Sequence, residues 1–280
     1  MSIAAIIVTY NPELSRFRHV FNQASKQVNH VIIIDNGSKT KDILRKLCNE
    51  TNNCDFVEVG FNSGVAHALR IGINYASRYG ADWLLFLDDD TILTINAVVK
   101  ALDLISNLPR FVLDRVGAIL LSSADGDCSI SEVKYGIFSG TLIRADIAAR
   151  VCCRDDFFLD QADHDMYSRI RKLGYLTLSI DCRLIDHRLG TVRWSKILHK
   201  SISYEPPWRY YYIVRNSTKL LIEGRINFVF YALQLIIWGV RILLVDGPWK
   251  IIKPLGLGII HALLNELGYV DLVHLLSSND

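Results

Sequence analysis

Three uninterrupted apolar runs, each followed at once by a polar cluster, most constrain how this chain can fold. Runs without polar alternation are typical of strands that are buried on both faces, as in a parallel sheet. Helical patterns between the runs predict a doubly wound α/β fold, whose ligands bind outside the carboxyl ends of the strands. We therefore expect the three polar clusters, TYNP (9–12), DNGS (35–38) and DDDT (88–91), along one edge of one sheet.

The segments up to about residue 203 continue this pattern. A helix is predicted from Gly64 to Tyr79, with an apolar face and Gly80 as its C-terminal stop. Further helices are expected at 94–106, at 145–151 and from Asp163 to Gly174, and further strands at VGAILL (116–121), YGIFSGTLI (135–143) and YLTLSI (175–180). The polar stretch 122–131 resembles a loop. These elements predict one α/β domain over residues 1–203, with a mostly parallel sheet and flanking helices.

Residues 204–280 differ in character from this domain. The mean hydropathy of +0.22 is high for a freely soluble protein, and this tail carries much of the excess. Its segment PPWRYYYIVRN (206–216) is aromatic and basic, and 15 uncharged residues follow between Arg225 and Arg241. A membrane-spanning helix needs roughly 20 apolar residues, so we expect an amphipathic helical tail. It either packs on the preceding domain or lies in a membrane interface.

Charge and cysteine content exclude several classes. A net charge of +2 gives no case for nucleic-acid binding. The six cysteines contain no C-x-x-C pair and no zinc-like spacing, so we interpret them as reduced thiols of a cytosolic protein. The first apolar run has no basic leader and is read as a buried strand, not as a signal peptide.

The aspartate triplet Asp88-Asp89-Asp90 is the clearest candidate for a metal site. Three carboxylates at one strand end repel one another, and a divalent cation relieves this repulsion. Oxygen ligands suit Mg²⁺ or Mn²⁺, and such a cation can stabilise a diphosphate as a leaving group. The alternative is an acidic turn in which Asp90 or Thr91 caps the next helix.

The other polar clusters suit a nucleotide. No G-x-G-x-x-G turn follows the first strand, which argues against a nicotinamide or flavin site. Tyr10 offers an aromatic face to a planar base, and Asp35 could accept a hydrogen bond from a ring N–H or a ribose hydroxyl. Asn62 and Gly64 stand at a predicted helix N-terminus, where backbone amides attract phosphate. Ordinary roles as turn or capping residues remain the alternative for each.

Taken together and in order, the motifs resemble the inverting glycosyltransferases of family 2, including their GT-A-type nucleotide-binding half. The resemblance spans about residues 3–190 and continues into PWRYYYIVRN, and it looks closest to the bacterial rhamnosyltransferases of O-antigen and cell-wall assembly. The motifs that carry it are TYNP, IDNGS, NSG, LDDDT, FSGTLIR, FFLDQADHDMYSRIRKLGY and HRLG.

The resemblance implies a role for each matching position. The residues expected to contact the base and the ribose are Thr9, Tyr10, Asn11 and Asp35. Asp88 and Asp90 match the outer aspartates of the DXD element, with Asp90 the direct metal ligand. His187 matches a histidine that contacts the metal or the diphosphate.

The resemblance also implies a catalytic base. Asp163 matches the aspartate of the family's Glu-Asp motif, and Arg169 follows it as a substrate contact. Because Ala162 replaces the usual glutamate, Asp160 and Asp165 remain rivals for the base. A base is needed in any case, since an acceptor hydroxyl is a poor nucleophile until its proton is removed. Without the resemblance, an N-terminal helix cap explains Asp163 equally well.

The implied reaction is transfer of a sugar from a dTDP- or UDP-sugar, with dTDP-L-rhamnose as the expected donor. The expected acceptor is a polyprenyl-diphosphate-linked glycan at the inner membrane surface, where Arg209 and Arg215 could face the diphosphate. Two other functional classes are the alternatives: a metal-dependent phosphatase with Asp88 as nucleophile, and a non-catalytic nucleotide-binding subunit. Thr91 directly follows Asp90 and does not fit the phosphatase signature D-x-D-x-T.

Overall fold

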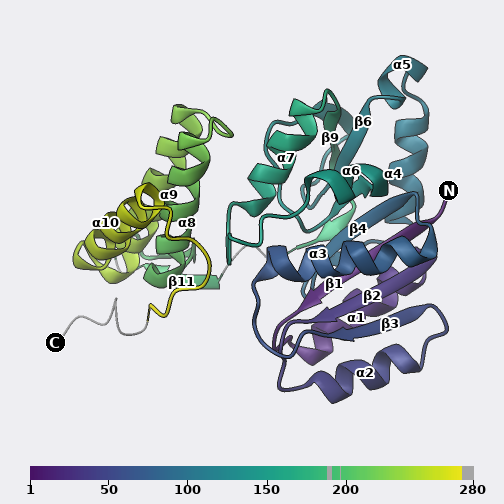
Figure 1. Cartoon of the computed structure of the whole chain (residues 1–280), viewed down its shortest axis with the longest axis horizontal. Helices are drawn as coiled ribbons and strands as arrows, with labels where there is room; N and C mark the ends of the chain where they lie inside the picture. The colour runs from purple at the N-terminus through teal and green to yellow at the C-terminus, as the bar shows by residue number, and fades with distance from the viewer. Residues whose placement is uncertain (188–190, 196, 273–280) are drawn as a thin grey trace. The chain divides into compact units, whose positions relative to one another are not determined.

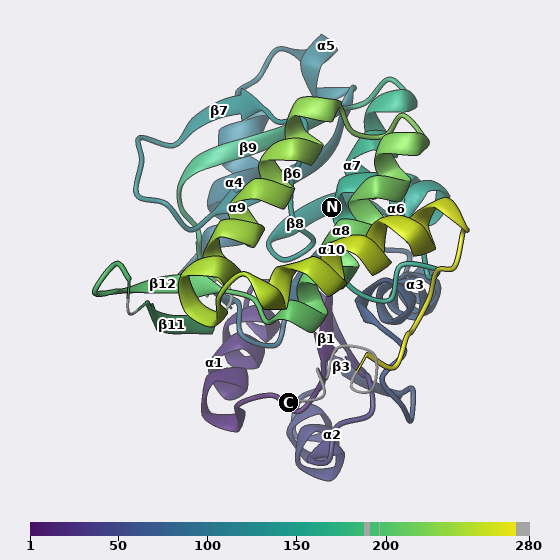
Figure 2. The ribbon, with the colours of Figure 1, turned by 90° about the vertical axis from the view of Figure 1, so that its left-hand side faces the viewer.

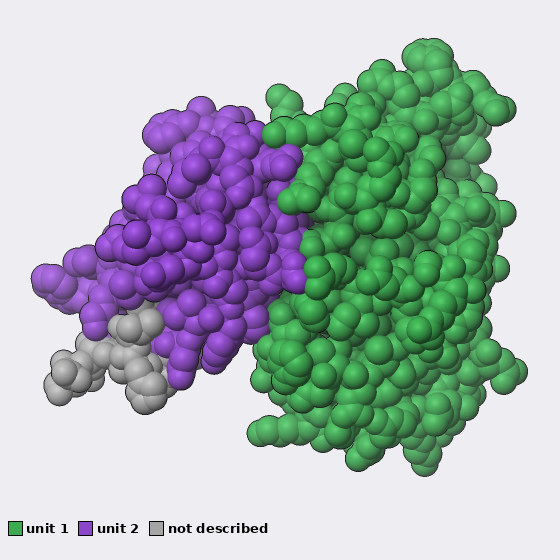
Figure 3. Space-filling model, in the orientation of Figure 1, with its two compact units in different colours: residues 1–153, 166–187 green, residues 154–165, 188–280 purple. Residues whose placement is uncertain are grey.

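The computed structural model describes residues 1–187, 191–195 and 197–272, which form two compact units (Figure 3). The first unit contains Met1–Cys153 and Met166–His187, and the second contains Arg154–Asp165 and the residues from 188 onward. The second unit thus includes the region expected as a tail, together with the short segment 154–165 that carries Asp163.

An eight-stranded sheet forms the centre of the first unit, in the order β3-β2-β1-β4-β8-β6-β9-β7 (Figure 1). Strands β1 to β4 are mutually parallel and β6 is parallel to β9, whereas β8 and β7 run antiparallel to their neighbours. The bounds are β1 (Ile3–Thr9), β2 (His30–Asp35), β3 (Cys54–Glu58), β4 (Trp83–Asp88), β6 (Val116–Ser122), β7 (Ser129–Glu132), β8 (Thr141–Arg144) and β9 (Leu176–Arg183). The predicted α/β class with a mostly parallel sheet is confirmed.

The strand register aligns the polar clusters. Thr9, the last residue of β1, pairs with Asp35 at the end of β2, and Val8 pairs with Asp88 at the end of β4. Because these strands are parallel, their carboxyl ends lie at one edge of the sheet. The expectation that the three clusters share an edge is therefore met.

Helices cover both faces of this sheet. On one face, Phe17 and Phe21 of α1 join the core formed by Ile7 and Ile33, and α2 and α4 contribute to the same core. On the other face α3 lies so close to β1 that a Cβ atom on Gly72 would meet Ile6 Cγ2 at 2.5 Å. The helices of this unit are α1 (Leu14–Ser25), α2 (Lys41–Asn49), α3 (Val65–Ala76), η1 (Ser77–Tyr79), α4 (Ala97–Ser106), α5 (Arg110–Leu113), α6 (Ala145–Val151) and most of α7 (Ala162–Lys172).

Three local expectations were wrong or only partly right. The stretch 122–131 is not entirely a loop, because β7 begins at Ser129 and pairs with β9 at the sheet edge. The strand expected at 135–143 is confined to β8, since residues before Thr141 turn into the site described below. The cysteines are not free thiols: Cys48 pairs with Cys54, Cys128 with Cys182, and Cys152 with Cys153.

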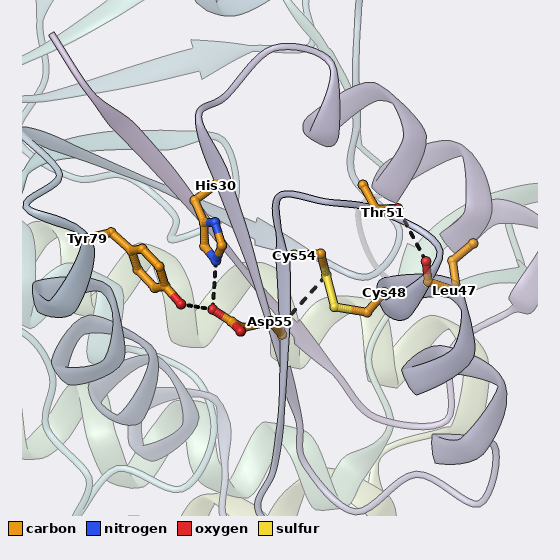
Figure 4. The surroundings of a disulfide bond; sticks show 7 residues. All are labelled: His30, Leu47, Cys48, Thr51, Cys54, Asp55 and Tyr79. Carbon is orange, nitrogen blue, oxygen red and sulfur yellow. Dashed lines mark hydrogen bonds and ion pairs between the residues drawn. A yellow bond between two sulfur atoms is a disulfide. The ribbon is translucent and has the colours of Figure 1, made fainter.

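The first two cysteine pairs form because the fold brings their segments together, and the spacing of the cysteines in the sequence does not show this. The turn between α2 and β3 brings the Cα atoms of Cys48 and Cys54 to 5.3 Å. Next to this pair, His30 Nε2 lies 2.7 Å from Asp55 Oδ2, which also accepts from Tyr79 (Figure 4). The Cα atoms of Cys128 and Cys182 are 4.5 Å apart because the segment entering β7 runs beside β9.

The second unit is mainly helical, with α8 (Pro207–Ile222), α9 (Phe228–Asp246) and α10 (Trp249–Leu263). A hairpin of β11 (Thr191–Ser195) and β12 (Lys200–Tyr204) lies beside α9 (Figure 2), where Ser195 Oγ donates to the carbonyl of Leu244. Helix α9 has 19 residues and is long and apolar enough to cross a membrane: an 18-residue window of it has a mean hydropathy of 2.1, and 11% of that window is buried. It exceeds the expected 15-residue run because the helix continues past Arg241.

Candidate functional site

Two carboxylates and one imidazole meet at the carboxyl edge of the sheet. Asp88 is the last residue of β4, and Asp90 lies in the turn after it. His187 follows β10 (Ile185–Asp186), which pairs with β5 (Ile92–Leu93) just after the aspartates. Each of the three offers a ligand atom, and these atoms all lie within 4.8 Å of one another. Among the described residues this cluster could hold a metal ion, and the ligand roles expected of Asp90 and His187 stay predictions.

Hydrogen bonds fix the geometry of this cluster. Thr91 Oγ1 lies 2.6 Å from His187 Nδ1 and accepts from Ser139 Oγ at 2.7 Å. Ser139 Oγ also accepts from the backbone N–H of Asp88 at 2.8 Å. The imidazole of His187 and the backbone at Asp88 are therefore held by a shared pair of buried hydroxyl groups, and hydrogen bonds of this kind are typical around metal ligands.

Arg16 is a site residue that the sequence analysis missed. It is 9% exposed, and its Nε donates to the carbonyl of Asp90 at 2.6 Å. Its Nη2 donates to the carbonyl of Asp186 at 3.0 Å, so one guanidinium connects the two loops that carry Asp90 and His187. No motif surrounds Arg16 in the sequence. Ser139, in contrast, lies within FSGTLIR and could have been identified from that motif.

Asp89, the middle residue of the triplet, makes a different contact from Asp88 and Asp90. Asp89 Oδ2 accepts from the backbone N–H of Tyr10 at 3.2 Å, which ties the β4 turn to the β1 turn. Burial raises the pKa of Asp89 to about 7, with Asp88 and Asp90 adding to the effect. Asp89 is not part of the three-residue cluster described above.

The residues expected at the nucleotide build the adjoining part of the edge. Asp35 is fully buried: its Oδ1 accepts from Thr9 Oγ1 at 3.0 Å and its Oδ2 from the Ser38 N–H at 3.0 Å. Asn11 accepts from the Lys39 N–H at 2.9 Å. Tyr10 differs from these, because its side chain is 49% exposed and leaves a ring face open to a planar base.

Asn62 and Gly64 stand at the start of α3, as predicted. Asn62 Oδ1 accepts from Asn36 Nδ2 at 3.1 Å and from the Gly64 N–H at 3.2 Å. Gly64 is the residue before the helix and has a φ of +85°, a conformation that favours glycine. This arrangement connects the β2 turn to the N-terminus of α3, where backbone N–H groups attract anions.

The proposed base and its rivals lie in the segment 154–165 of the second unit. Asp163 is 19% exposed, and its Oδ1 accepts from the His164 N–H at 2.8 Å. Burial raises the pKa of the Asp163 carboxyl, and the neighbouring His164 opposes this shift. Asp165 is 1% exposed and lies 3.5 Å from Arg225 Nε.

Asp160 is engaged by Arg209. The guanidinium donates from Nε and Nη2 to Asp160 at 3.0 Å each, and from Nη1 to Glu205 at 2.9 Å. Arg169 lies later on α7 within the first unit and is partly buried. The substrate contacts expected of Arg209 and Arg169 stay predictions. The last three residues of the HRLG motif, 188–190, lie outside the described residues.

Two comparisons of the sequence found similar proteins. Residues 4–126 match the model of glycosyl transferase family 2. The chain is 26% identical to "dTDP-rhamnosyl transferase RfbF" of Shigella flexneri, over 80% of this chain and 81% of that protein.

Two solved structures are similar in fold. The structure of S. aureus TarS 1-349 in complex with UDP-GlcNAc matches with a TM-score of 0.56 and 17% identity, over 94% of this chain and 81% of that one. GalNAc-T7 with UDP, GalNAc and Mn²⁺ matches with a TM-score of 0.55 and 13% identity. The match to GalNAc-T7 covers 67% of this chain and 44% of that protein.

Proposed function

We propose that this chain, which is a family 2 glycosyltransferase, transfers L-rhamnose from dTDP-L-rhamnose to a lipid-linked glycan with inversion at the anomeric carbon. The observation that carries the proposal is the Asp88, Asp90 and His187 cluster at the carboxyl edge of a nucleotide-binding sheet. The choice of donor rests on the similarity to a protein named as a dTDP-rhamnosyl transferase. A UDP-sugar is the alternative donor.

The set of ligand atoms in the cluster suits a divalent cation. Carboxylate oxygens favour Mg²⁺ or Mn²⁺, and Asp88, Asp90 and His187 would hold it. When bound, such an ion neutralises charge that develops on the departing nucleoside diphosphate. Next to this cluster, the exposed ring of Tyr10 is suited to stack on the base, and the backbone amides that begin α3 are suited to phosphate.

Asp163 is the best-suited base of the three carboxylates in its segment. Arg209 engages Asp160 through two donors, and Asp165 is almost completely buried beside Arg225. Asp163 is the most accessible of the three and has a raised pKa, which strengthens a carboxylate as a proton acceptor. In the proposed step, Asp163 takes the acceptor hydroxyl proton as that oxygen bonds to the anomeric carbon. The bond from this carbon to the diphosphate oxygen breaks in the same displacement.

A membrane surface is the proposed location, on the cytoplasmic side. Helices α9 and α10 expose large apolar side chains, and residues 225–263 contain four Lys or Arg and one Asp. An apolar face with flanking cations is typical of helices that lie in the interface of an anionic membrane. Gly239 and Ile242 of α9 are buried within the second unit, so this helix packs on its neighbours along one side.

The test is a transfer assay with the full chain. The protein is incubated with Mg²⁺ or Mn²⁺, a polyprenyl-diphosphate glycan, and either dTDP-L-rhamnose or a panel of UDP-sugars. We expect metal-dependent transfer with dTDP-L-rhamnose and an inverted anomeric configuration of the product by NMR. Transfer from a UDP-sugar alone would change the donor assignment, and retention of configuration would refute the single displacement.

A further inference from the structure

The segment that carries Asp163 is held by helices that follow it by many residues in the chain. Asn216 Nδ2 of α8 donates to the carbonyls of Leu159 and Asp160, at 2.6 and 3.1 Å. Both Asp160 and Gln161 have left-handed φ angles, 59° and 71°. Residues other than glycine keep such angles when their surroundings determine them. The conformation just before Asp163 therefore depends on contacts with the helices.

One side chain of α9 contacts this segment on both sides of Asp163. Gln161 Nε2 donates to Gln234 Oε1 at 2.6 Å, and Gln234 Nε2 lies 3.1 Å from His164 Nε2. One helical turn earlier, the Phe230 ring meets the His164 ring edge-to-face at 5.0 Å between centroids. Gln161 is 6% exposed, so its hydrogen bond to Gln234 is shielded from water.

These contacts also define the His164 ring. With the Gln234 amide donating to Nε2, the ring proton of a neutral His164 is on Nδ1. That nitrogen lies 3.8 Å from Asp163 Oδ1. The hydrogen bonds therefore run from Gln161 through Gln234 to His164, which is adjacent to Asp163 both in sequence and in space.

We infer that Gln234 is a positioning residue, which holds the segment on both sides of Asp163 and thereby orients the proposed base. The inference rests on the proposed function for the role of Asp163. Helix α9 would then have two faces with different roles. Phe230 and Gln234 contact the base segment, whereas Leu233, Ile236 and Val240 are exposed on the apolar face.

The matched variants remove one contact each. Gln234→Leu removes both hydrogen bonds and keeps the size and helix propensity of the side chain. Gln161→Leu removes the same connection from the other side, and serves if the first variant fails to fold. The control is Tyr231→Phe, which removes a hydrogen bond between α9 and Thr218 of α8, at 3.1 Å, and leaves residues 161 and 164 in place.

Hydrogen exchange is the activity-independent readout. We expect amides 161–166 to exchange about tenfold faster in Gln234→Leu than in the wild type, because local opening becomes easier. The Tyr231→Phe control should leave these amides unchanged. Unchanged exchange of 161–166 in folded Gln234→Leu would overturn the inference.

Kinetics then distinguish positioning from general destabilisation. Misplacing a catalytic group by about 1 Å can cost roughly 100-fold, so we expect kcat to fall roughly 10- to 100-fold. The KM for the donor should stay within about twofold, and the Gln161→Leu/Gln234→Leu double variant should be no slower than the worse single variant. Additive losses would contradict the inference.

A wild-type chain that transfers no sugar would refute the proposed function, while the exchange data would still decide the role of Gln234.

Discussion

His187 Nδ1 lies 3.5 Å from Asp90 Oδ1 and 2.6 Å from Thr91 Oγ1. A histidine that binds a metal usually uses one ring nitrogen for the ion and anchors the other through a hydrogen bond. Thr91 therefore holds the imidazole beside Asp90, and Nδ1 is the ring nitrogen that faces the Asp90 carboxylate. This pairing is possible because β10 lies against β5, directly after the aspartates.

Removing Asp90 or His187 should weaken metal binding. We expect Asp90→Ala to lower kcat/KM at least 100-fold, and His187→Ala roughly 10- to 100-fold, because each removes one of the three groups that could hold the ion. Titration of Mn²⁺ by EPR measures the affinity directly. Unchanged Mn²⁺ affinity in both variants would show that the ion binds elsewhere.

Asp89→Asn is the matched control for these variants. The Asp89 carboxyl accepts one backbone hydrogen bond, from Tyr10, and an asparagine oxygen can accept the same bond. We expect transfer activity within about threefold of the wild type and unchanged Mn²⁺ affinity. A loss as large as that of Asp90→Ala would make Asp89 a ligand and contradict the assignment.

Some features of the fold and the site could be predicted from the sequence, and others could not. The solid apolar runs predicted the strands, and parallel strands bring their carboxyl ends together, so Asp35 and Asp88 could be placed on one edge in advance. Arg16, Gln234 and the cysteine pair Cys128–Cys182 could not, because each depends on contacts between segments distant in the chain. Edge strand β7 was missed since both of its faces are largely polar and exposed.

Asp163→Asn should abolish transfer while preserving the fold. Asparagine is nearly isosteric with aspartate and can still accept the His164 N–H, but it cannot take a proton. We expect kcat to fall at least 1,000-fold, consistent in scale with loss of a general base, with donor affinity and melting temperature nearly unchanged. Asp165→Asn provides the comparison in the same segment, and a larger loss there would identify Asp165 as the base.

The pH dependence of kcat should reflect the raised pKa of Asp163. The carboxyl must be ionised to accept a proton, so activity falls as pH decreases through its pKa. Burial raises that pKa above the ordinary value of about 4, so the acid limb should lie at a higher pH than for a solvent-exposed carboxylate. A pH–rate profile from about pH 4 to 9 measures it, and a limb at the ordinary carboxyl value would contradict the assignment.

Membrane association should depend on the cations of α10 as well as on its apolar residues. Lys250 and Lys253 are exposed near Trp249 and Ile252, whose side chains are 81% and 58% exposed. Each Lys near an anionic membrane contributes ~1 kcal/mol. Removing two positive charges should therefore weaken partitioning roughly 30-fold, and charge reversal should weaken it further. We expect Lys250→Glu/Lys253→Glu to lose flotation with anionic liposomes.

The control for this variant has the same net charge. Lys26→Glu/Lys100→Glu changes two exposed lysines of the first unit, away from α9 and α10 in the chain, and should float like the wild type. Raising the salt concentration should weaken the wild type, since salt screens exposed charges, while the apolar contribution remains. Equal flotation of both double variants would mean that overall charge or apolar contact, and not these lysines, determines binding. Flotation that survives high salt and carbonate extraction would instead indicate that α9 spans the bilayer.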